Sequence, residues 1–305
     1  TAGVELLYTK HQSNLLPPSH PRHPPPGASM LSLLASLSLL STSVLTDGMM
    51  HTSRRQVMLL APALALLPHA SALALPPSQT VEGEVSLYFG AGCFWHVQHQ
   101  LVLAEQSLLG RAGGTITART GYAGGTRVAS GPSAGPAGAK VCYHNPLGIA
   151  DYGVLGHAEA VEVSLPRSRV GDFAREYFAL FGRKGIRHDP QDRGGEYRSV
   201  LGLPGGEASE LYAAVAEAAR GTPMRLVPGV GDEGDTIGSK TILVYDSEKF
   251  PFFPAELYHQ FHNDFMGPPY GEAYNNLLAT LYKEKKLFTV GCPDMDPATI
   301  VEGRV

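Results

Sequence analysis

Hydrophobic and polar positions become periodic only after about residue 82, and from there they predict strands and helices. Residues 84–90, EVSLYFG, alternate between apolar and polar side chains, as a strand does. Beyond them, apolar side chains recur every three or four residues, which predicts one buried face of a helix. The positions on this face are Phe94, Val97, Leu101, Ala104 and Leu108. Gly110 follows the last of them and is expected to end the helix.

The same alternation continues along the rest of the chain. Strands are predicted at 115–121, 156–165, 196–202 and 241–246, and helices at 172–182, 209–221, 255–262 and 273–287. Residues 126–152 are rich in Gly and Pro, which predicts a long loop. Strands alternating with helices indicate an α+β fold, a two-layer α/β sandwich with a mixed central sheet.

Residues 1–80 lack this pattern and are predicted to be a leader in front of one domain at 81–305. Pro, Ser, Leu and Ala dominate the leader, and Asp47 is its one acidic residue between positions 6 and 81. Residues 20–29, HPRHPPPGAS, are of low complexity, and residues 30–45, MLSLLASLSLLSTSVL, are rich in Ser and free of acids, as organelle transit segments are.

The second part of the leader resembles a cleaved export signal. Paired arginines, Arg54 and Arg55, precede an apolar run that is too short to cross a bilayer as a helix. Small residues near Ala72 or Ala74 are typical of a cleavage site. A transit-like segment followed by such a signal predicts a plastid protein, delivered to the thylakoid lumen; another exported compartment is the alternative.

The net charge of −4 gives no sign of a basic surface for nucleic acid, so we expect no nucleic-acid binding. We also expect a monomer without stable membrane association. Three cysteines are too few for a disulfide scaffold, and none of them forms a CxxC pair. A reactive or redox role is therefore expected for at least one of the three.

Cys93 has the sequence surroundings of a nucleophile. It follows Gly90 and Gly92, where the first predicted strand gives way to the first predicted helix. Unpaired backbone N–H groups and the positive end of the helix dipole stabilise a thiolate there, which predicts a lowered pKa for this cysteine. The alternative is a buried cysteine that only packs.

Glu159 interrupts an otherwise apolar strand face. It shares that face with Val161, Val163 and Leu165. Either the alternation slips at the strand end, or the carboxyl points to the apolar side. In the second case burial raises its pKa, and a proton donor becomes available near neutral pH. A thiolate beside a proton donor suits attack of sulfur on a polarised, weakly basic oxygen compound.

Six short motifs, taken together and in order, resemble the peptide methionine sulfoxide reductase A family. They are GAGCFW, GYAGG, VC, GHAEAVEV, HDPQDRGGEYRS and AELYHQFH, and the similarity covers residues 84–265. The resemblance implies an α/β sandwich that reduces the S epimer of methionine sulfoxide, free or in oxidised proteins and peptides. It implies no bound cofactor, and thioredoxin or another dithiol as the reductant.

The motif positions imply roles for individual residues. Cys93 would attack the sulfoxide sulfur and become a sulfenic acid, while Glu159 would protonate the oxygen. Phe94 and Trp95 would hold the methyl group of the substrate between apolar faces.

Further positions of the motifs complete the implied site. Asp192 and Tyr197 would order water and hydrogen-bond the oxygen, and Tyr122 and His157 would contribute to substrate binding. A second thiol would resolve the sulfenic acid to a disulfide. Family members often place it near the C-terminus, which favours Cys292, with Cys142 as the alternative.

The chain departs from the family pattern around these residues. His96, Val97 and Gln98 stand where Gly-Val-Glu usually follows GCFW, and Gly138 stands where a second active-site tyrosine is usual. The segment between Cys142 and Glu159 is longer than in the family. Tyr143 or Tyr152 in this insertion could replace the missing hydroxyl.

Rival interpretations of the same residues differ in testable ways. A cysteine hydrolase would use His157 as its base, but the flanking residues of such enzymes are absent. A sulfoxide-binding or redox-sensing protein would bind its ligand without turnover. His259 and His262 lie three apart, but no cysteine or carboxylate completes a ligand set with them, so no metal site is predicted.

Overall fold

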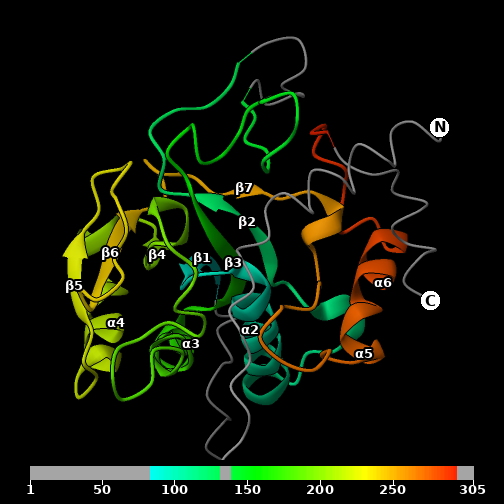
Figure 1. The fold of residues 1–305 in the computed structure, drawn as a ribbon. Coiled ribbons are helices and arrows are strands. Elements are labelled where there is room, and N and C mark those ends of the chain that lie inside the picture. The colour runs from blue at the N-terminus through cyan, green and yellow to red at the C-terminus, as the bar shows by residue number, and fades with distance from the viewer. Residues whose placement is uncertain (1–82, 131–138, 294–305) are drawn as a thin grey trace, which may run out of the picture. The chain divides into compact units, whose positions relative to one another are not determined.

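A seven-stranded mixed sheet forms the centre of this computed structural model, which describes residues 83–130 and 139–293 (Figure 1). The strand order is β5-β6-β4-β1-β3-β2-β7. The strands are β1 Glu84–Gly90, β2 Arg119–Ala123, β3 Ala158–Pro166, β4 Val200–Leu203, β5 Arg225–Pro228, β6 Thr241–Asp246 and β7 Phe253–Pro254. β6 runs parallel to β4 and β5, whereas β1, β2 and β3 pair with their neighbours in antiparallel fashion. The sheet is therefore mixed, as predicted.

The three longest helices lie together along one side of the sheet (Figure 1). The α-helices are α2 Phe94–Leu109, α3 Val170–Ala179, α4 Tyr212–Ala219, α5 Glu272–Asn275 and α6 Leu277–Lys283. Single turns of 3-10 helix are η1 Gly113–Thr115, η2 Arg167–Arg169, η3 Gly195–Tyr197, η4 Gly206–Ala208 and η5 Leu257–His259. α2 contacts β1, β2, β3 and α3, and α3 in turn packs on α4. This arrangement confirms the predicted two-layer sandwich.

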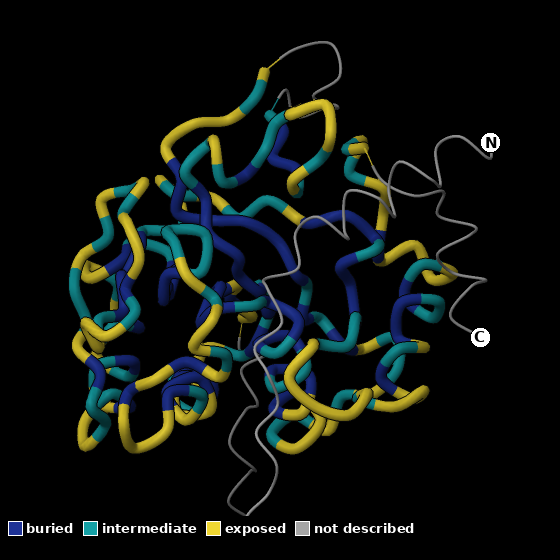
Figure 2. The backbone as a smooth tube through the Cα atoms, in the orientation of Figure 1, coloured by how far each residue is buried: buried dark blue, intermediate teal, exposed yellow. Residues whose placement is uncertain are grey.

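The alternation of side chains along the strands separates two hydrophobic clusters. Leu87 and Phe89 of β1 face the helices and belong to the main core, whereas Tyr88 between them belongs to a smaller cluster on the opposite face. Phe250 and Phe252 pack against that smaller cluster. Figure 2 shows the buried backbone concentrated along the central strands.

Most predicted elements are present, with boundaries that shift by a few residues. β1 and β6 match their predictions, and α2 ends at Gly110, which adopts the left-handed conformation with φ 65°. The strands predicted at 115–121 and 196–202 begin later, at Arg119 and Val200, and the 3-10 turns η1 and η3 occupy Thr115 and residues 196–197. The helix predicted at 273–287 is divided into α5 and α6.

The helix predicted at 255–262 is wrong, since η5 is the one helical turn there. The side chain of Gln260 instead donates to the carbonyl oxygens of Thr120 and Ala255 and accepts from the Thr120 N–H group. Phe261 has φ 54°, a left-handed value that ends any helix. This segment runs alongside β2 and reaches the site described below.

Several predictions fall outside the described residues. These are the leader at 1–80, its cleavage near Ala72 or Ala74, and the position of Gly138. All described residues belong to one compact unit. Among them, no helix has both the length and the apolar character to span a membrane.

Candidate active site

Cys93 lies between the end of β1 and the start of α2, where it occupies the N-cap position. Gly92 before it has φ +83°, and a Cβ there would lie 2.7 Å from Oδ2 of Asp192. Both the backbone conformation and the close carboxylate therefore require glycine. Cys93 is half-buried and is not part of a disulfide.

Two carboxyl groups from other parts of the chain accept the first N–H groups of α2. The Cys93 N–H donates to Oδ2 of Asp192 at 2.8 Å, and the Phe94 N–H donates to Oε2 of Glu159 at 2.8 Å. Groups that a helix start leaves unpaired are thus satisfied by acids from β3 and from the segment after α3. These contacts bring Glu159 and Asp192 next to Cys93, as the sequence predicts.

Glu159 points to the apolar side of β3 and is 2 % exposed, which confirms the second of the two interpretations. Burial raises the pKa of its carboxyl to about 8, and the charge of Asp192 acts in the same direction. The Phe94 N–H and the Tyr152 hydroxyl, which donates to Oε1 at 3.3 Å, oppose the shift. The carboxyl is therefore protonated at neutral pH.

The expected lowering of the Cys93 pKa is wrong. Burial raises the pKa of the thiol well above its usual value, and the charges of Glu159 and Asp192 add to this. The backbone amides of Trp95 and His96, at the start of α2, act in the opposite direction. The helix terminus thus has the predicted effect, but desolvation is larger, and the thiol keeps its proton at neutral pH.

A small pocket of about 100 Å³ opens beside Cys93. Six predicted site residues line it: Cys93, Phe94, Trp95, Glu159, Asp192 and Tyr197. Eight further residues complete its wall: Ala91, His96, Tyr143, His188, Asp189, Asp264, Phe265 and Met266. Residues that lie far apart in the sequence therefore meet at one cavity that contains a thiol and a neutral acid.

Aromatic rings form one side of the pocket. The Trp95 ring stacks on His262 with centroids 4.1 Å apart, and Phe265 meets it edge-on at 5.3 Å. Phe265 is 85 % exposed, so the apolar wall extends to the surface. The lining also includes the carboxyl groups of Glu159 and Asp192, so a ligand here meets an apolar surface and a proton donor together.

Arg187 holds Asp192 and Tyr197 in position, and nothing in the sequence pattern marks it as a site residue. It is buried, and its guanidinium donates to the backbone oxygens of Asp192 and Tyr197 and pairs with Asp235 at 2.9 Å. A basic residue in a predicted loop is expected at the surface, which is why the sequence does not single it out.

Tyr122 and His157 do not line the pocket, which corrects their predicted place in the substrate site. Tyr122 is fully buried behind Phe94 and donates its hydroxyl to Glu256 at 2.7 Å. His157 is buried and bonds the backbone of a loop, with its Nε2 2.7 Å from the Arg127 oxygen. His157, the base that a cysteine hydrolase was expected to use, is therefore not in the pocket.

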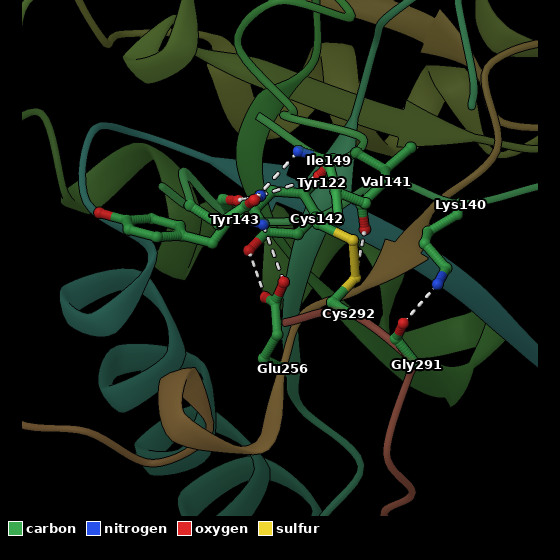
Figure 3. The surroundings of a disulfide bond; sticks show 10 residues. Tyr122, Lys140, Val141, Cys142, Tyr143, Ile149, Glu256, Gly291 and Cys292 are labelled. Carbon is green, nitrogen blue, oxygen red and sulfur yellow. Dashed lines mark hydrogen bonds between the residues drawn. A yellow bond between two sulfur atoms is a disulfide. The ribbon is translucent and has the colours of Figure 1, made fainter. Parts of the chain in front are cut away.

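Cys142 and Cys292 are joined to each other by a disulfide, with their Cα atoms 5.6 Å apart (Figure 3). Neither of the two predicted resolving residues is bonded to Cys93 in this state. Figure 3 shows Glu256 beside the bridge, accepting the Tyr143 N–H at 2.8 Å. Because Tyr143 lines the pocket, the disulfide is one residue away from the pocket wall along the chain.

The two tyrosines of the insertion have different environments. Tyr152 is fully buried, and its hydroxyl contacts the carboxyl of Glu159 and does not line the pocket. Tyr143 lines the pocket and stacks on Tyr152 with centroids 5.6 Å apart. Within the insertion, Tyr152 therefore contacts the buried Glu159 carboxyl, and Tyr143 forms part of the pocket wall.

We expect iodoacetamide to alkylate Cys93 slowly at neutral pH, with an onset at higher pH than for an ordinary thiol. In unreduced protein Cys93 is the single free thiol, so mass spectrometry of labelling time courses reports on it alone. Glu159→Gln removes a charge that raises the pKa, and labelling of this variant should begin at lower pH. An onset in the wild type at or below that of free cysteine would contradict this assignment.

Comparisons with known proteins agree with the motifs. The chain is 30 % identical over 115 residues to peptide methionine sulfoxide reductase MsrA of Geobacter metallireducens, a match that covers 37 % of this chain and 57 % of that relative. The chain thus spans a little more than half of the length of the curated relative that it matches. No family model matches.

Two solved structures are also similar to the chain. Methionine sulfoxide reductase A of Corynebacterium diphtheriae has a TM-score of 0.35 and 20 % identity, over 58 % of this chain and 73 % of that one. Mxr1 of Saccharomyces cerevisiae in reduced form has a TM-score of 0.32 and 21 % identity, over 59 % of this chain and 84 % of that one.

Proposed function

Because the chain is a diverged, MsrA-like protein, we propose that it reduces methionine sulfoxide to methionine with Cys93 as the nucleophile. One observation carries the proposal: the Cys93 thiol and the neutral Glu159 carboxyl line the same small pocket, and consecutive backbone amides anchor that carboxyl and Asp192. Removal of the sulfoxide oxygen needs a nucleophile and a proton donor, and this thiol and this carboxyl would supply them.

The proposed reaction conserves protons within the pocket. Glu159 gives its proton to the sulfoxide oxygen, which makes the sulfur more electrophilic. The Cys93 sulfur attacks the sulfoxide sulfur as its own proton passes to the Glu159 carboxylate. The protonated oxygen then moves from the substrate sulfur to the Cys93 sulfur as the bond between the two sulfurs breaks, which leaves a sulfenic acid on Cys93 and a thioether as the product. The raised pKa values of both groups suit this exchange, because each starts protonated.

The shape of the pocket supports recognition of a methyl sulfoxide. Phe94 and Trp95 offer apolar surface to the methyl group, and the polar groups of Tyr197 and Asp192 also line the pocket. A chiral sulfoxide that puts its methyl group on the rings and its oxygen toward Glu159 presents one face of the sulfur to Cys93. We assign this arrangement to the S epimer.

A dithiol would complete the cycle. A thiol condenses with the sulfenic acid to a disulfide and releases water, and thioredoxin or another dithiol then reduces that disulfide by exchange. Cys292, with Cys142 as the alternative, would act as the resolving thiol once their mutual disulfide has been reduced.

The test is an assay of the two epimers of a methionine sulfoxide peptide with excess dithiothreitol, followed by chromatography of the product. We expect the S epimer to be consumed and the R epimer to remain. Consumption of neither epimer, together with saturable binding of the S epimer, would replace the proposal with a sulfoxide-binding protein. That alternative draws on the raised pKa of the Cys93 thiol, because a protonated thiol is a weak nucleophile unless a base accepts its proton.

A further inference from the structure

Three potential metal ligands from separate segments meet at the wall of the pocket. They are His96 in the first turn of α2, His188 after α3 and Asp264 before α5. Nδ1 of His96 and Nε2 of His188 each lie 3.5 Å from Oδ2 of Asp264. One ligand atom from each residue lies within 4.8 Å of the other two.

These separations suit a shared ion better than direct hydrogen bonds. A separation of 3.5 Å exceeds the usual range of a hydrogen bond between nitrogen and oxygen. Two ligands of a tetrahedral Zn²⁺ ion, each about 2.0–2.1 Å from the metal, are about 3.3 Å apart. The observed spacing is therefore close to the edge of such a coordination tetrahedron.

Neighbouring side chains hold the carboxylate of the cluster in place. Oδ2 of Asp264 also accepts the Tyr270 hydroxyl, which orients the carboxylate. Tyr270 in turn stacks on His99 with centroids 3.7 Å apart.

One rearrangement is needed before an ion binds. The His96 and His188 rings lie face to face, 3.7 Å apart and inclined by 4°, so their lone pairs lie in two parallel planes. The His188 side chain is 36 % exposed, which leaves room for it to rotate and to direct its nitrogen at the ion.

We propose that His96, His188 and Asp264 form a binding site for one divalent transition-metal ion, with Zn²⁺ as its probe, in the wall of the Cys93 pocket. Two imidazoles and a carboxylate are an established ligand set for such ions, and they leave further coordination positions open. The site is specific to this chain in one respect, since His96 stands where the resemblance expects glycine. The proposal departs from the sequence-based expectation of no metal site, which considered neither His96 nor Asp264.

Zn²⁺ binding to the full chain tests the proposal directly. The protein carries Cys93→Ser and keeps the Cys142–Cys292 disulfide, so that no thiol competes for the ion. Equilibrium dialysis is expected to find one equivalent of Zn²⁺ that His188→Gln and Asp264→Asn each weaken at least about tenfold. Co²⁺ absorption adds the coordination geometry, and His262→Gln, in the same segment as Asp264 but outside the cluster, is the matched control.

A second measurement separates lost binding from lost folding. Zn²⁺ should raise the unfolding temperature of the Cys93→Ser protein, because an ion that binds only the folded state stabilises it. The His188→Gln and Asp264→Asn variants should unfold cooperatively without this shift. Binding that survives both substitutions, or that His262→Gln weakens equally, would overturn the proposal.

Discussion

Cys93→Ser is expected to reduce turnover of methionine sulfoxide by about four orders of magnitude, to the uncatalysed background. A serine hydroxyl is a far weaker nucleophile than a thiol, and it cannot take the sulfoxide oxygen to form a sulfenic acid. The side chain is half-buried at a helix N-cap position that serine favours, so the fold should be preserved. Chromatography of the reduced peptide, with excess dithiothreitol as the reductant, measures the loss.

Cys292→Ser is the matched control for this experiment. It removes the Cys142–Cys292 disulfide but leaves Cys93 in place. Since dithiothreitol can reduce a sulfenic acid directly, this variant should still turn over the S epimer with that reductant. Full activity in Cys93→Ser, or equal loss in both variants, would show that Cys93 is not the nucleophile.

Glu159→Gln is expected to lower turnover by about 10²- to 10⁴-fold, because it removes the proton donor of the pocket. The amide has nearly the shape of the acid, and its oxygen can still accept the Phe94 N–H. The wild type should lose activity as the pH rises above about 8, where the carboxyl ionises, and the variant should lack this dependence. Initial rates across the neutral and alkaline range, with the unfolding temperature as a control, provide the comparison.

The same substitution changes stability in a defined direction. The folded state holds the Glu159 proton up to about pH 8, whereas the unfolded chain releases it near the ordinary value of 4.5. The contribution of the neutral acid is thus complete below pH 4.5 and decreases as the pH rises through 8. Glu159→Gln removes this decrease, so the variant should be the more stable protein at alkaline pH. If Glu159→Gln kept wild-type activity while its stability no longer varied with pH, Glu159 would act in packing alone.

The fold was predictable where an element is long or rich in apolar residues. α2 has one apolar face over sixteen residues, and β1 and β6, of seven and six residues, carry apolar side chains that are buried on both faces of the sheet. β5 and β7 have four and two residues, too few for any alternation to be visible. The segment at 255–262 has helix-like spacing, but the Gln260 amide takes up backbone groups of β2 that a helix would leave unpaired.

The site was predictable where the neighbouring sequence of a residue marks it. Cys93 and Glu159 are marked by their own surroundings, a strand-to-helix junction and a strand face. Asp192 lies in a loop and Tyr197 in the 3-10 turn η3, and only the family resemblance pointed to them. The direction of the Cys93 pKa was missed because a position along a helix does not reveal how deeply neighbouring segments bury it.

The disulfide between Cys142 and Cys292 limits how far the C-terminal end of the protein can be truncated. It spans 150 residues of sequence and holds the last described segment against the strand-like stretch that leads into Tyr143, with Lys140 also bonded to the Gly291 oxygen. A shortened version that stops before Gly291 would keep the thiol and the acid but release one wall of their cavity. Crystallisation or protease mapping of such a truncated form would therefore describe an open variant of the site.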